Sequence, residues 1–215
     1  RPEEVHRSPC SHSILHAGVM KEFIEALEKL ALGLEANSEE FTRLDSEAGD
    51  ADLGLTAGKI AVGIRTALAE PGDSVKQLVL ALGKEISKAA PSTFGTLYAS
   101  GFLAAGLALN DEDDALTQLK TGLQAALEKI AQRGKSEEGQ RTLLDALGPG
   151  SRAASLATDI PSALASAAVA AGEGVEATKA MTPQHGRAGW IGERAKGIAD
   201  AGATVIWRSF EAVSS

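Results

Sequence analysis

The sequence is poor in cysteine, aromatic residues and positive charge, and each shortage excludes a class of protein. A single cysteine, Cys10, rules out a disulfide bond within the chain. Aromatic residues are 4% of a chain that is 44% hydrophobic, so alanine and leucine supply most of the apolar surface. A formal net charge of −8 gives no electrostatic basis for binding nucleic acid or an anionic membrane surface. This composition favours closely packed helices with neither of those partners.

Long hydrophobic runs are missing as well. No apolar stretch approaches the ~20 residues that a membrane-spanning helix needs, and the sequence has no signal-peptide pattern, so we expect a cytoplasmic protein. Residues 1–19 differ from the rest of the chain and contain Cys10 and three histidines. We expect them to be an N-terminal extension or a cloning remnant that precedes a natural start at Met20. A transition-metal site on these residues is the alternative.

From Met20 onward, apolar residues recur at helical spacing, and no segment alternates convincingly at the period of a strand. Proline and glycine separate the segments, as at Pro71-Gly72. At 215 residues the chain is long enough to bury the core of one large domain. We predict a single all-α domain with eight principal helices, at about residues 20–34, 55–70, 74–90, 95–109, 116–134, 141–148, 162–181 and 203–215.

Finer features of these helices are also predicted. Asn37 followed by Glu40 resembles a capping box for a short additional turn of helix. The nearly uncharged segment 95–109 is expected to be central in the bundle. Gly134 is expected to be the glycine that ends its helix, and the sixth helix to be interrupted or to end around residues 148–150.

Three aspartates follow the first helix, with glycines between them. Asp45, Asp50 and Asp52 lie within eight residues of one another. Carboxylate oxygens are the ligands that Mg²⁺ prefers, and glycine permits the tight turn that brings them together. The alternative is a solvated turn whose aspartates cap the next helix. An EF-hand calcium loop fits worse, because it requires carboxylates where the sequence has Gly54 and Ala61.

If consecutive helices run up and down, the connections after the first, third, fifth and seventh helices lie at one end of the bundle. These connections contain the aspartates, Ser92 and Thr93, and the arginines of the last loop, whereas the opposite connections near Pro71, Asn110 and Gly150 have no such group. They span residues 45–54, 91–95, 134–140 and 182–202. The sequence therefore predicts one site at one end of a helical barrel.

Three of these connections have alternative interpretations. Ser92 or Thr93 is either an ordinary helix cap or part of a phosphate site formed with backbone N–H groups. Arg187 and Arg194 either bind phosphate oxygens or form structural ion pairs with Glu193 or Asp200. The segment that begins at Gly134 is either a turn and cap or a lining of a nucleotide site. His185 is expected to be a surface residue, since nothing near it in sequence would orient it as a base.

Seven short motifs follow one another along the chain. They are Leu44-Asp45-x-x-x-Gly49-Asp50-Ala51-Asp52-x-Gly54, Gly95-x-Leu97-Tyr98, Arg133-Gly134-Lys135, Gly139-x-Arg141-Thr142-x-x-Asp145, Gly186-Arg187-Ala188, Gly192-Glu193-Arg194 and Asp200-x-Gly202-Ala203. Taken together, they resemble the L-subunit, or nucleotide-binding, domain of dihydroxyacetone kinases. The resemblance covers roughly Met20 to the C-terminus, with every motif in the same order.

The resemblance implies a barrel of eight antiparallel up-and-down helices with a nucleotide, ADP or ATP, at one end. It implies that Asp45, Asp50 and Asp52 hold two Mg²⁺ ions that bridge the phosphates, with Arg187 adding a fixed positive charge. It also implies that a separate K subunit holds the ketose substrate, and that in some systems a subunit of the phosphotransferase chain rephosphorylates bound ADP. The residues that match nucleotide contacts of the family are Leu53, Gly54, Leu55, Thr56, Thr93, Phe94, Gly134, Leu143, Arg187, Asp200, Ala201 and Gly202.

The chain departs from the family pattern in its phosphate-binding segments. Leu53 replaces the histidine that usually follows the third aspartate, and Pro91 and Phe94 replace members of a glycine- and serine-rich turn. Gln140 and Ala201 replace an aspartate and a proline.

From the resemblance we predict a Mg²⁺-dependent, adenine-nucleotide-binding subunit of a ketose kinase. The alternatives are a non-catalytic nucleotide-binding or regulatory subunit, and an unrelated helical scaffold.

Overall fold

The computed structural model describes residues 9–184 and 196–215, and gives only the backbone for residues 9–17 and Ala48. The described residues form nine α-helices and no strands, which confirms the all-α prediction. None of these helices is both long and apolar enough to cross a membrane. The helices are α1 (Pro9–Ala36), α2 (Ser38–Ala48), α3 (Leu53–Leu68), α4 (Val75–Ala89), α5 (Thr93–Ala108), α6 (Ala115–Gly134), α7 (Leu144–Leu156), α8 (Ile160–Thr178) and α9 (Ala201–Ser214).

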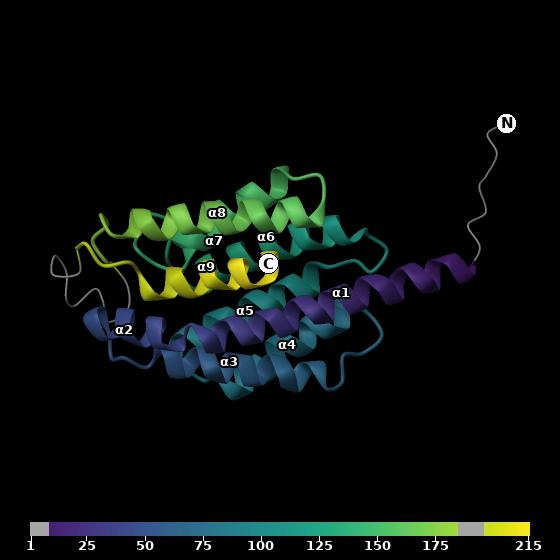
Figure 1. Ribbon diagram of the computed structural model, residues 1–215, viewed down its shortest axis with the longest axis horizontal. Helices are drawn as coiled ribbons and strands as arrows, with labels where there is room; N and C mark the ends of the chain where they lie inside the picture. Colours follow the sequence, from purple (N-terminus) through teal and green to yellow (C-terminus); the bar gives the residue numbers. More distant parts are fainter. Residues whose placement is uncertain (1–8, 185–195) are drawn as a thin grey trace.

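Eight of the described helices form a closed ring. Each packs against the next in the order α1, α3, α4, α5, α6, α7, α8 and α9, and α9 returns to α1 (Figure 1). The ninth, α2, leads on from α1 after a single residue, Asn37, and packs mainly on α3 and α9. Because α2 continues toward the same end as α1, the up-and-down alternation of the ring is preserved. The predicted barrel of eight antiparallel helices is confirmed, with α2 added at one end.

Two predictions about the first helices were wrong. The first helix begins at Pro9 and not at Met20, so it crosses the expected end of the N-terminal extension. Proline is tolerated at the first helical position because its missing N–H has no intrahelical partner there. The predicted capping box is not formed either, because the Asn37 amide donates to the carbonyl of Gly33 at 2.8 Å. Glu40 instead pairs with Arg208, which is 168 residues away in the sequence.

The nearly uncharged helix α5 is part of the ring wall and is not central. It packs between α4 and α6, and Leu107 on its outer face is 73% exposed. The lack of charge in α5 reflects the small side chains on its inner faces, which include buried Ala99 and Ala105. Small side chains also line the inner face of α8, where Ala163, Ala167 and Ala171 are fully buried. They let neighbouring helices approach closely, as the alanine-rich sequence predicts.

Helix α7 runs through Pro149 to Leu156, so the prediction that it is interrupted or ends around residues 148–150 was wrong. A helical proline cannot donate to the carbonyl four residues earlier, which here belongs to Asp145. That carbonyl oxygen lies against Gly174 of α8, where an added Cβ would be 1.9 Å from it. Close packing between α7 and α8 at this point therefore requires glycine.

We expect Gly174→Ala to destabilise the protein by about 2–3 kcal/mol, because the new methyl group would meet a backbone oxygen that cannot rotate away. Gly58→Ala in α3 is the matched control, since no atom lies within 4 Å of the added Cβ. In the control, the gain in helix propensity should stabilise the protein by about 0.5–1 kcal/mol. Urea unfolding measures both changes. Equal effects of the two substitutions would contradict the close α7–α8 contact.

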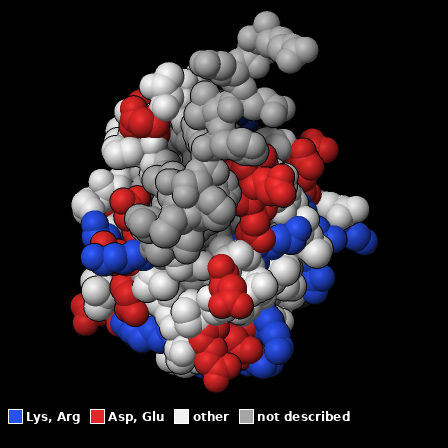
Figure 2. Space-filling model, turned by 90° about the vertical axis from the view of Figure 1, so that its right-hand side faces the viewer, with Lys and Arg blue, Asp and Glu red and all other residues white. Residues whose placement is uncertain are grey.

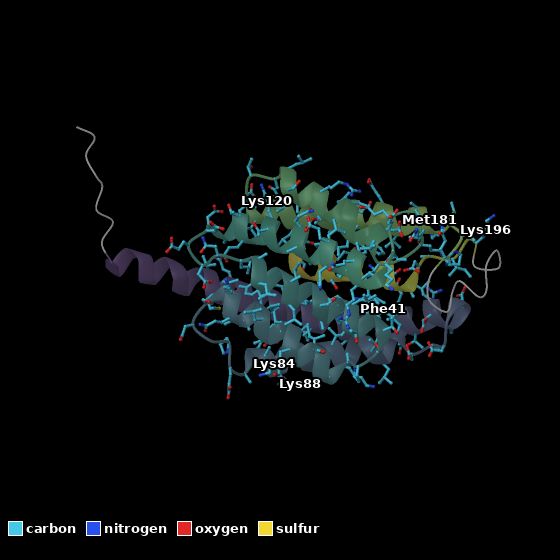
Figure 3. All side chains as sticks on the ribbon, turned by 180° about the vertical axis from the view of Figure 1, so that it is seen from behind. Phe41, Lys84, Lys88, Lys120, Met181 and Lys196 are labelled. Atoms are coloured by element: carbon cyan, nitrogen blue, oxygen red, sulfur yellow. The ribbon has the colours of Figure 1, made fainter. Side chains whose placement is uncertain are left out.

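The core lies inside the ring and extends under α2. Phe41 of α2 is fully buried and is labelled in Figure 3. A cavity of about 320 Å³ remains inside the barrel, lined mostly by apolar side chains from the ring helices. Tyr98 lies on this lining and donates to or accepts from the Ser209 hydroxyl at 3.1 Å. Burial raises the pKa of Tyr98 to about 12, so its hydroxyl stays protonated at neutral pH.

The two ends of the barrel are built from different connections. The end that lies away from the predicted site faces the viewer in Figure 2, where acidic and basic side chains are interspersed. There the Lys76 ammonium donates to the carbonyl of Leu109, and Lys120 donates to the carbonyl of Ala157. The third connection at this end is 157–159 and not the predicted Gly150 region. The four connections predicted to form the site gather at the other end of the barrel, where Met181 and Lys196 are labelled in Figure 3.

Candidate functional site

The four connections predicted to share one end of the barrel are joined there by direct contacts. The Thr56 hydroxyl at the start of α3 donates to the Ser92 hydroxyl before α5 at 3.3 Å. The N–H of Gln184 donates to the carbonyl of Gln140 at 3.4 Å, which links the α8–α9 connection to the α6–α7 connection. The ring of Phe94 lies against Gly202, which links α5 to α9. One group of loops therefore covers this end.

The three aspartates come together at this end. Asp45 is on the last turn of α2 and is half-buried, whereas Asp50 and Asp52 lie in the exposed turn before α3. One carboxylate oxygen from each lies within 4.8 Å of the other two. Oxygens on opposite sides of one octahedral Mg²⁺ are about 4.2 Å apart, twice the Mg–O distance of about 2.1 Å. The donor set fits Mg²⁺ after a small inward movement.

The backbone of this turn is shaped around Asp45. Its Oδ2 accepts from the N–H groups of Asp52 at 2.9 Å and Leu53 at 3.2 Å, which satisfies two donors at the start of α3. A Cβ on Gly49 would lie 2.1 Å from Asp45 Oδ1, so only glycine leaves room for this carboxylate. Ala51 has a left-handed φ of 62°. The turn therefore has a defined shape that turns the carboxylates toward one another.

The alternative that these aspartates only cap the next helix is wrong for Asp52. Asp52 occupies the N-cap position of α3, but its side chain makes no capping hydrogen bond. Asp45 performs that role from the preceding helix with one oxygen, and its Oδ1 lies on the side of Gly49. A cap therefore explains part of the role of Asp45 and does not explain why the Asp52 carboxylate lies beside it.

Four helix N-termini point toward this end, because α3, α5, α7 and α9 all begin there. Unpaired N–H groups and the helix dipole make such N-termini favourable for anions. At α5, the Ser92 hydroxyl accepts from the N–H of Gly95 at 3.0 Å, so Ser92 and not Thr93 is the cap. Thr93 is exposed beside it. The three aspartates, which can hold a cation, thus lie at the same end of the barrel as helix N-termini that favour an anion.

The residues matched to nucleotide contacts fall into distinct environments. Leu53 and Leu143 are buried, and Leu55 is 63% exposed on the outer face of α3. Gly134 ends α6, although the left-handed residue there is Lys135, with φ 48°, and not the predicted glycine. Phe94 is half-buried, with its ring centroid 5.9 Å from that of Tyr98.

The remaining predicted contacts divide between the start of α9 and an undescribed segment. Asp200, Ala201 and Gly202 lie at the N-terminus of α9, and Gly202 lies against the ring of Phe94. Arg187 lies outside the described residues, as do the alternatives that involve His185 and Arg194. The side chains of residues 1–17, on which a transition-metal site was the alternative, are outside them too.

A buried charged cluster beneath these loops was not assigned a role from the sequence. Arg141 is 2% exposed, has a left-handed φ of 58° and donates through Nη2 to the carbonyl of Ile198 at 2.9 Å. Its Nε and Nη1 have no hydrogen-bond partner among the described residues. Asp145, also buried, accepts from the N–H groups of Gly139 and Thr142. The only sequence signal was the spacing of Arg141 and Asp145 within one motif.

Asp200 is the third member of this cluster. Its Oδ2 caps α9 by accepting from the N–H of Ala203 at 2.8 Å, and its own N–H donates to the Thr178 hydroxyl at 2.9 Å. Burial of the carboxyl raises the pKa of Asp200 to about 6, although the N–H of Ala203 and the charge of Arg141 act in the opposite direction. Asp200 thus titrates closer to neutral pH than an exposed aspartate does.

The chain matches the DAK2 domain over residues 47–215. It is 31% identical over 189 residues to L-erythrulose kinase of Pectobacterium atrosepticum, covering 84% of this chain and 32% of that enzyme. It is 30% identical over 172 residues to the PEP-dependent dihydroxyacetone kinase 1, ADP-binding subunit DhaL, of Listeria innocua, covering 79% of this chain and 83% of that subunit. The chain therefore spans about a third of the kinase and most of the subunit.

Solved structures show the same fold. The native dihydroxyacetone kinase of C. freundii superposes with a TM-score of 0.72 at 25% identity, over 89% of this chain and 33% of that one. The complex of that kinase with AMP-PNP and Mg²⁺ also gives a TM-score of 0.72, at 24% identity, over 100% of this chain and 37% of the other. The extent of the family match and the similarity to the DhaL subunit together show that this chain belongs to the DAK2 domain family.

Proposed function

We propose that this chain is the Mg²⁺-dependent, adenine-nucleotide-binding unit of a ketose kinase, and that the domain responsible spans residues 20–215. The observation that carries the proposal is the convergence of Asp45, Asp50 and Asp52 at the end of the barrel where four helices begin. Phosphoryl transfer depends mainly on positioning and on neutralising phosphate charge. An end that combines metal-binding carboxylates with N–H donors is suited to that task.

The relatives support both the ligand and the class of substrate. The Listeria subunit is described as ADP-binding, and a structural neighbour was crystallised with AMP-PNP and Mg²⁺. Relatives named for erythrulose, dihydroxyacetone and 3,4-dihydroxy-2-butanone indicate a small hydroxyketone as the phosphoryl acceptor. We infer that a K-type subunit or domain holds this ketose. The phosphoryl donor is either ATP or a phosphotransferase subunit that rephosphorylates bound ADP.

The three aspartates would hold one or two Mg²⁺ ions. Bound Mg²⁺ neutralises phosphate charge and favours departure of the transferred group. Asp45 would have two roles, because the same carboxylate binds the N–H groups that begin α3. Phe94 and the segment 200–202 would line the nucleotide site on the side of α5 and α9. Arg187 is proposed to add positive charge from the last connection.

The alternative is a regulatory subunit that binds nucleotide without transferring phosphate, and Leu53 supports it. This residue replaces the histidine expected beside the third aspartate, and it is buried in the core. A buried leucine neither donates to a phosphate nor moves a proton. Both proposals include Mg²⁺-dependent nucleotide binding, so only transfer of phosphate distinguishes them.

The test is reconstitution with a dihydroxyacetone-binding K subunit, ATP and Mg²⁺. We expect dihydroxyacetone phosphate to form, detected by NADH oxidation with glycerol-phosphate dehydrogenase, and to be lost in Asp50→Asn/Asp52→Asn. Product formed by the double variant would show that these carboxylates are not responsible. If the wild-type chain binds nucleotide but yields no product with ATP or with a phosphotransferase donor, the regulatory alternative is supported.

A further inference from the structure

The helix that carries Asp45 is weakly attached to the helix before it. Helix α2 has 11 residues, shorter than the ~12–15 residues at which isolated helices become even marginally stable in water. A single residue separates it from α1, and its main packing partners are α3 and α9. The position of the Asp45 carboxylate therefore depends on what holds α2 against those two helices.

Apolar contacts fix the depth of α2 but do not determine its rotation. Phe41 and Leu44 are buried beneath it. Hydrophobic burial is non-directional, so these side chains tolerate small rotations and slides of the helix. The hydrogen bonds from Asp52 and Leu53 tie the Asp45 carboxylate to the start of α3. They do not tie α2 to α9, so a directional contact between those two helices is what fixes Asp45 relative to segment 200–202.

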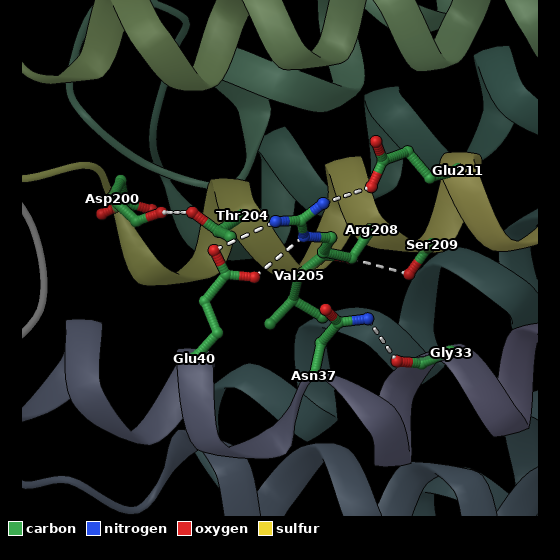
Figure 4. A network of polar contacts seen from close by, with 9 residues as sticks. All are labelled: Gly33, Asn37, Glu40, Asp200, Thr204, Val205, Arg208, Ser209 and Glu211. Carbon is green, nitrogen blue, oxygen red and sulfur yellow. Dashed lines mark hydrogen bonds and ion pairs between the residues drawn. The ribbon is translucent and has the colours of Figure 1, made fainter.

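Arg208 of α9 supplies a directional contact (Figure 4). Its Nε donates to Glu40 Oε2 at 2.8 Å, and its Nη2 donates to Glu40 Oε1 at 3.1 Å. The two parallel bonds fix the orientation of both side chains. Nη1 donates to Glu211 Oε2 at 2.6 Å, and the guanidinium lies 4.1 Å from the ring centroid of Trp207. The Arg208 and Glu40 side chains are only 25% and 27% exposed, so they are less screened than an exposed pair.

Three of the predicted nucleotide contacts, Asp200, Ala201 and Gly202, lie at the start of the same helix. Helix α9 begins with Asp200 as its cap, and Arg208 lies eight residues further on, about 12 Å along the axis. Glu40 lies five residues before Asp45, about 7.5 Å along α2. Helix α9 thus connects the nucleotide segment at its start to the helix that bears a metal carboxylate.

We propose that the Glu40–Arg208 pair is a strut that sets the spacing between the Asp45 carboxylate and the nucleotide segment 200–202, so that Arg208 is a positioning residue for the Mg²⁺–nucleotide complex. The inference rests on the proposed function, since it concerns how the metal and the nucleotide reinforce one another at that site. When the strut is intact, the Asp45 carboxylate is held at a fixed spacing from segment 200–202, at which Mg²⁺ and the phosphates would bind together. When the strut is absent, each ligand still binds, but Mg²⁺ improves nucleotide affinity less.

The experiment measures the coupling factor, the ratio of the ADP dissociation constant in EDTA to that in Mg²⁺, by calorimetry. In Arg208→Met and Glu40→Gln we expect this factor to fall about 10-fold, in line with the effect of partners that orient metal ligands. Affinity in EDTA should change less than about twofold. Glu211→Gln, which keeps both bonds to Glu40, should retain the wild-type coupling factor. The charge-swapped pair Glu40→Arg/Arg208→Glu should recover part of it.

Arg65→Met is the matched control, because it removes a similar ion pair that does not join α2 to α9. Arg65 also pairs bidentately with a glutamate, Glu35, but this pair joins α3 to α1. Thermal unfolding of each variant identifies general destabilisation, and Glu40→Gln provides a nearly isosteric change if Arg208→Met folds poorly. An unchanged coupling factor in Arg208→Met and Glu40→Gln would overturn the strut, as would equal losses of affinity with and without Mg²⁺. Absence of Mg²⁺ coupling in the wild-type chain would instead overturn the proposed function.

Discussion

Asp50→Asn/Asp52→Asn is expected to weaken ADP binding in Mg²⁺ buffer by about 100-fold or more, to the affinity that the wild-type chain shows in EDTA. Partners that only orient metal ligands contribute about 10–100-fold, so loss of two charged ligands should cost at least as much. Asparagine preserves the size of each side chain and leaves the hydrogen bonds of Asp45 to the turn in place. Equilibrium dialysis with labelled ADP measures the change.

The controls for this substitution are aspartates that cap helices elsewhere. Asp114 accepts from the N–H of Thr117, and Asp159 accepts from the N–H of Ser162, both outside the site. The double variant Asp114→Asn/Asp159→Asn removes the same two negative charges and should leave Mg²⁺-dependent ADP affinity unchanged. A similar loss of affinity in this control would point to net charge and not to a metal site.

Asp200→Asn is expected to stabilise the protein at neutral pH. Burial raises the pKa of this carboxyl from 3.8 to about 6, so the folded chain holds the proton more tightly than the unfolded chain does. The resulting stability is fully present below about pH 4 and is lost as pH rises through 6. At about 1.4 kcal/mol per pKa unit, the ionised group costs up to about 3 kcal/mol at pH 7 and above. Asparagine retains an oxygen that can cap Ala203 and has no such cost.

Urea unfolding between pH 4 and 8 tests this expectation. The stability advantage of Asp200→Asn should be largest at pH 7–8 and should shrink below pH 5. Asp159 provides the opposite case, because hydrogen bonds from Ser162 lower its pKa. Its contribution is present above the unfolded pKa and is lost on acidification, so Asp159→Asn should be destabilising at neutral pH. An advantage of Asp200→Asn that does not vary with pH would show that burial does not raise the pKa of Asp200 in the folded chain.

The helical ring was predictable because its signals are local. Apolar periodicity, Pro71-Gly72 and the cap at Ser74 each act within a few residues, and short connections make consecutive helices antiparallel. The sequence also predicted that the three aspartates meet, because they belong to one turn. The start of α1 at Pro9 was not predicted, although proline is favoured at the first position of a helix.

The errors came from contacts between residues far apart in the chain. Glu40 fits a capping box by its spacing from Asn37, but its partner is Arg208 in the last helix. Helix α7 continues past Pro149, and the carbonyl left without a helical partner there packs against Gly174 of α8. Arg141 donates to the carbonyl of Ile198, and its charge acts on the buried carboxyl of Asp200. Both residues are more than fifty positions away in the sequence. Only the folded chain identifies such partners.

The most direct test of a Mg²⁺-dependent nucleotide site is a calorimetric titration of the wild-type chain with ADP, in Mg²⁺ and in EDTA. We expect saturable binding at one site per chain in Mg²⁺, and binding that is weaker by about two orders of magnitude in EDTA. Equal affinity under the two conditions would contradict a metal role for Asp45, Asp50 and Asp52. No binding under either condition would contradict the nucleotide site itself.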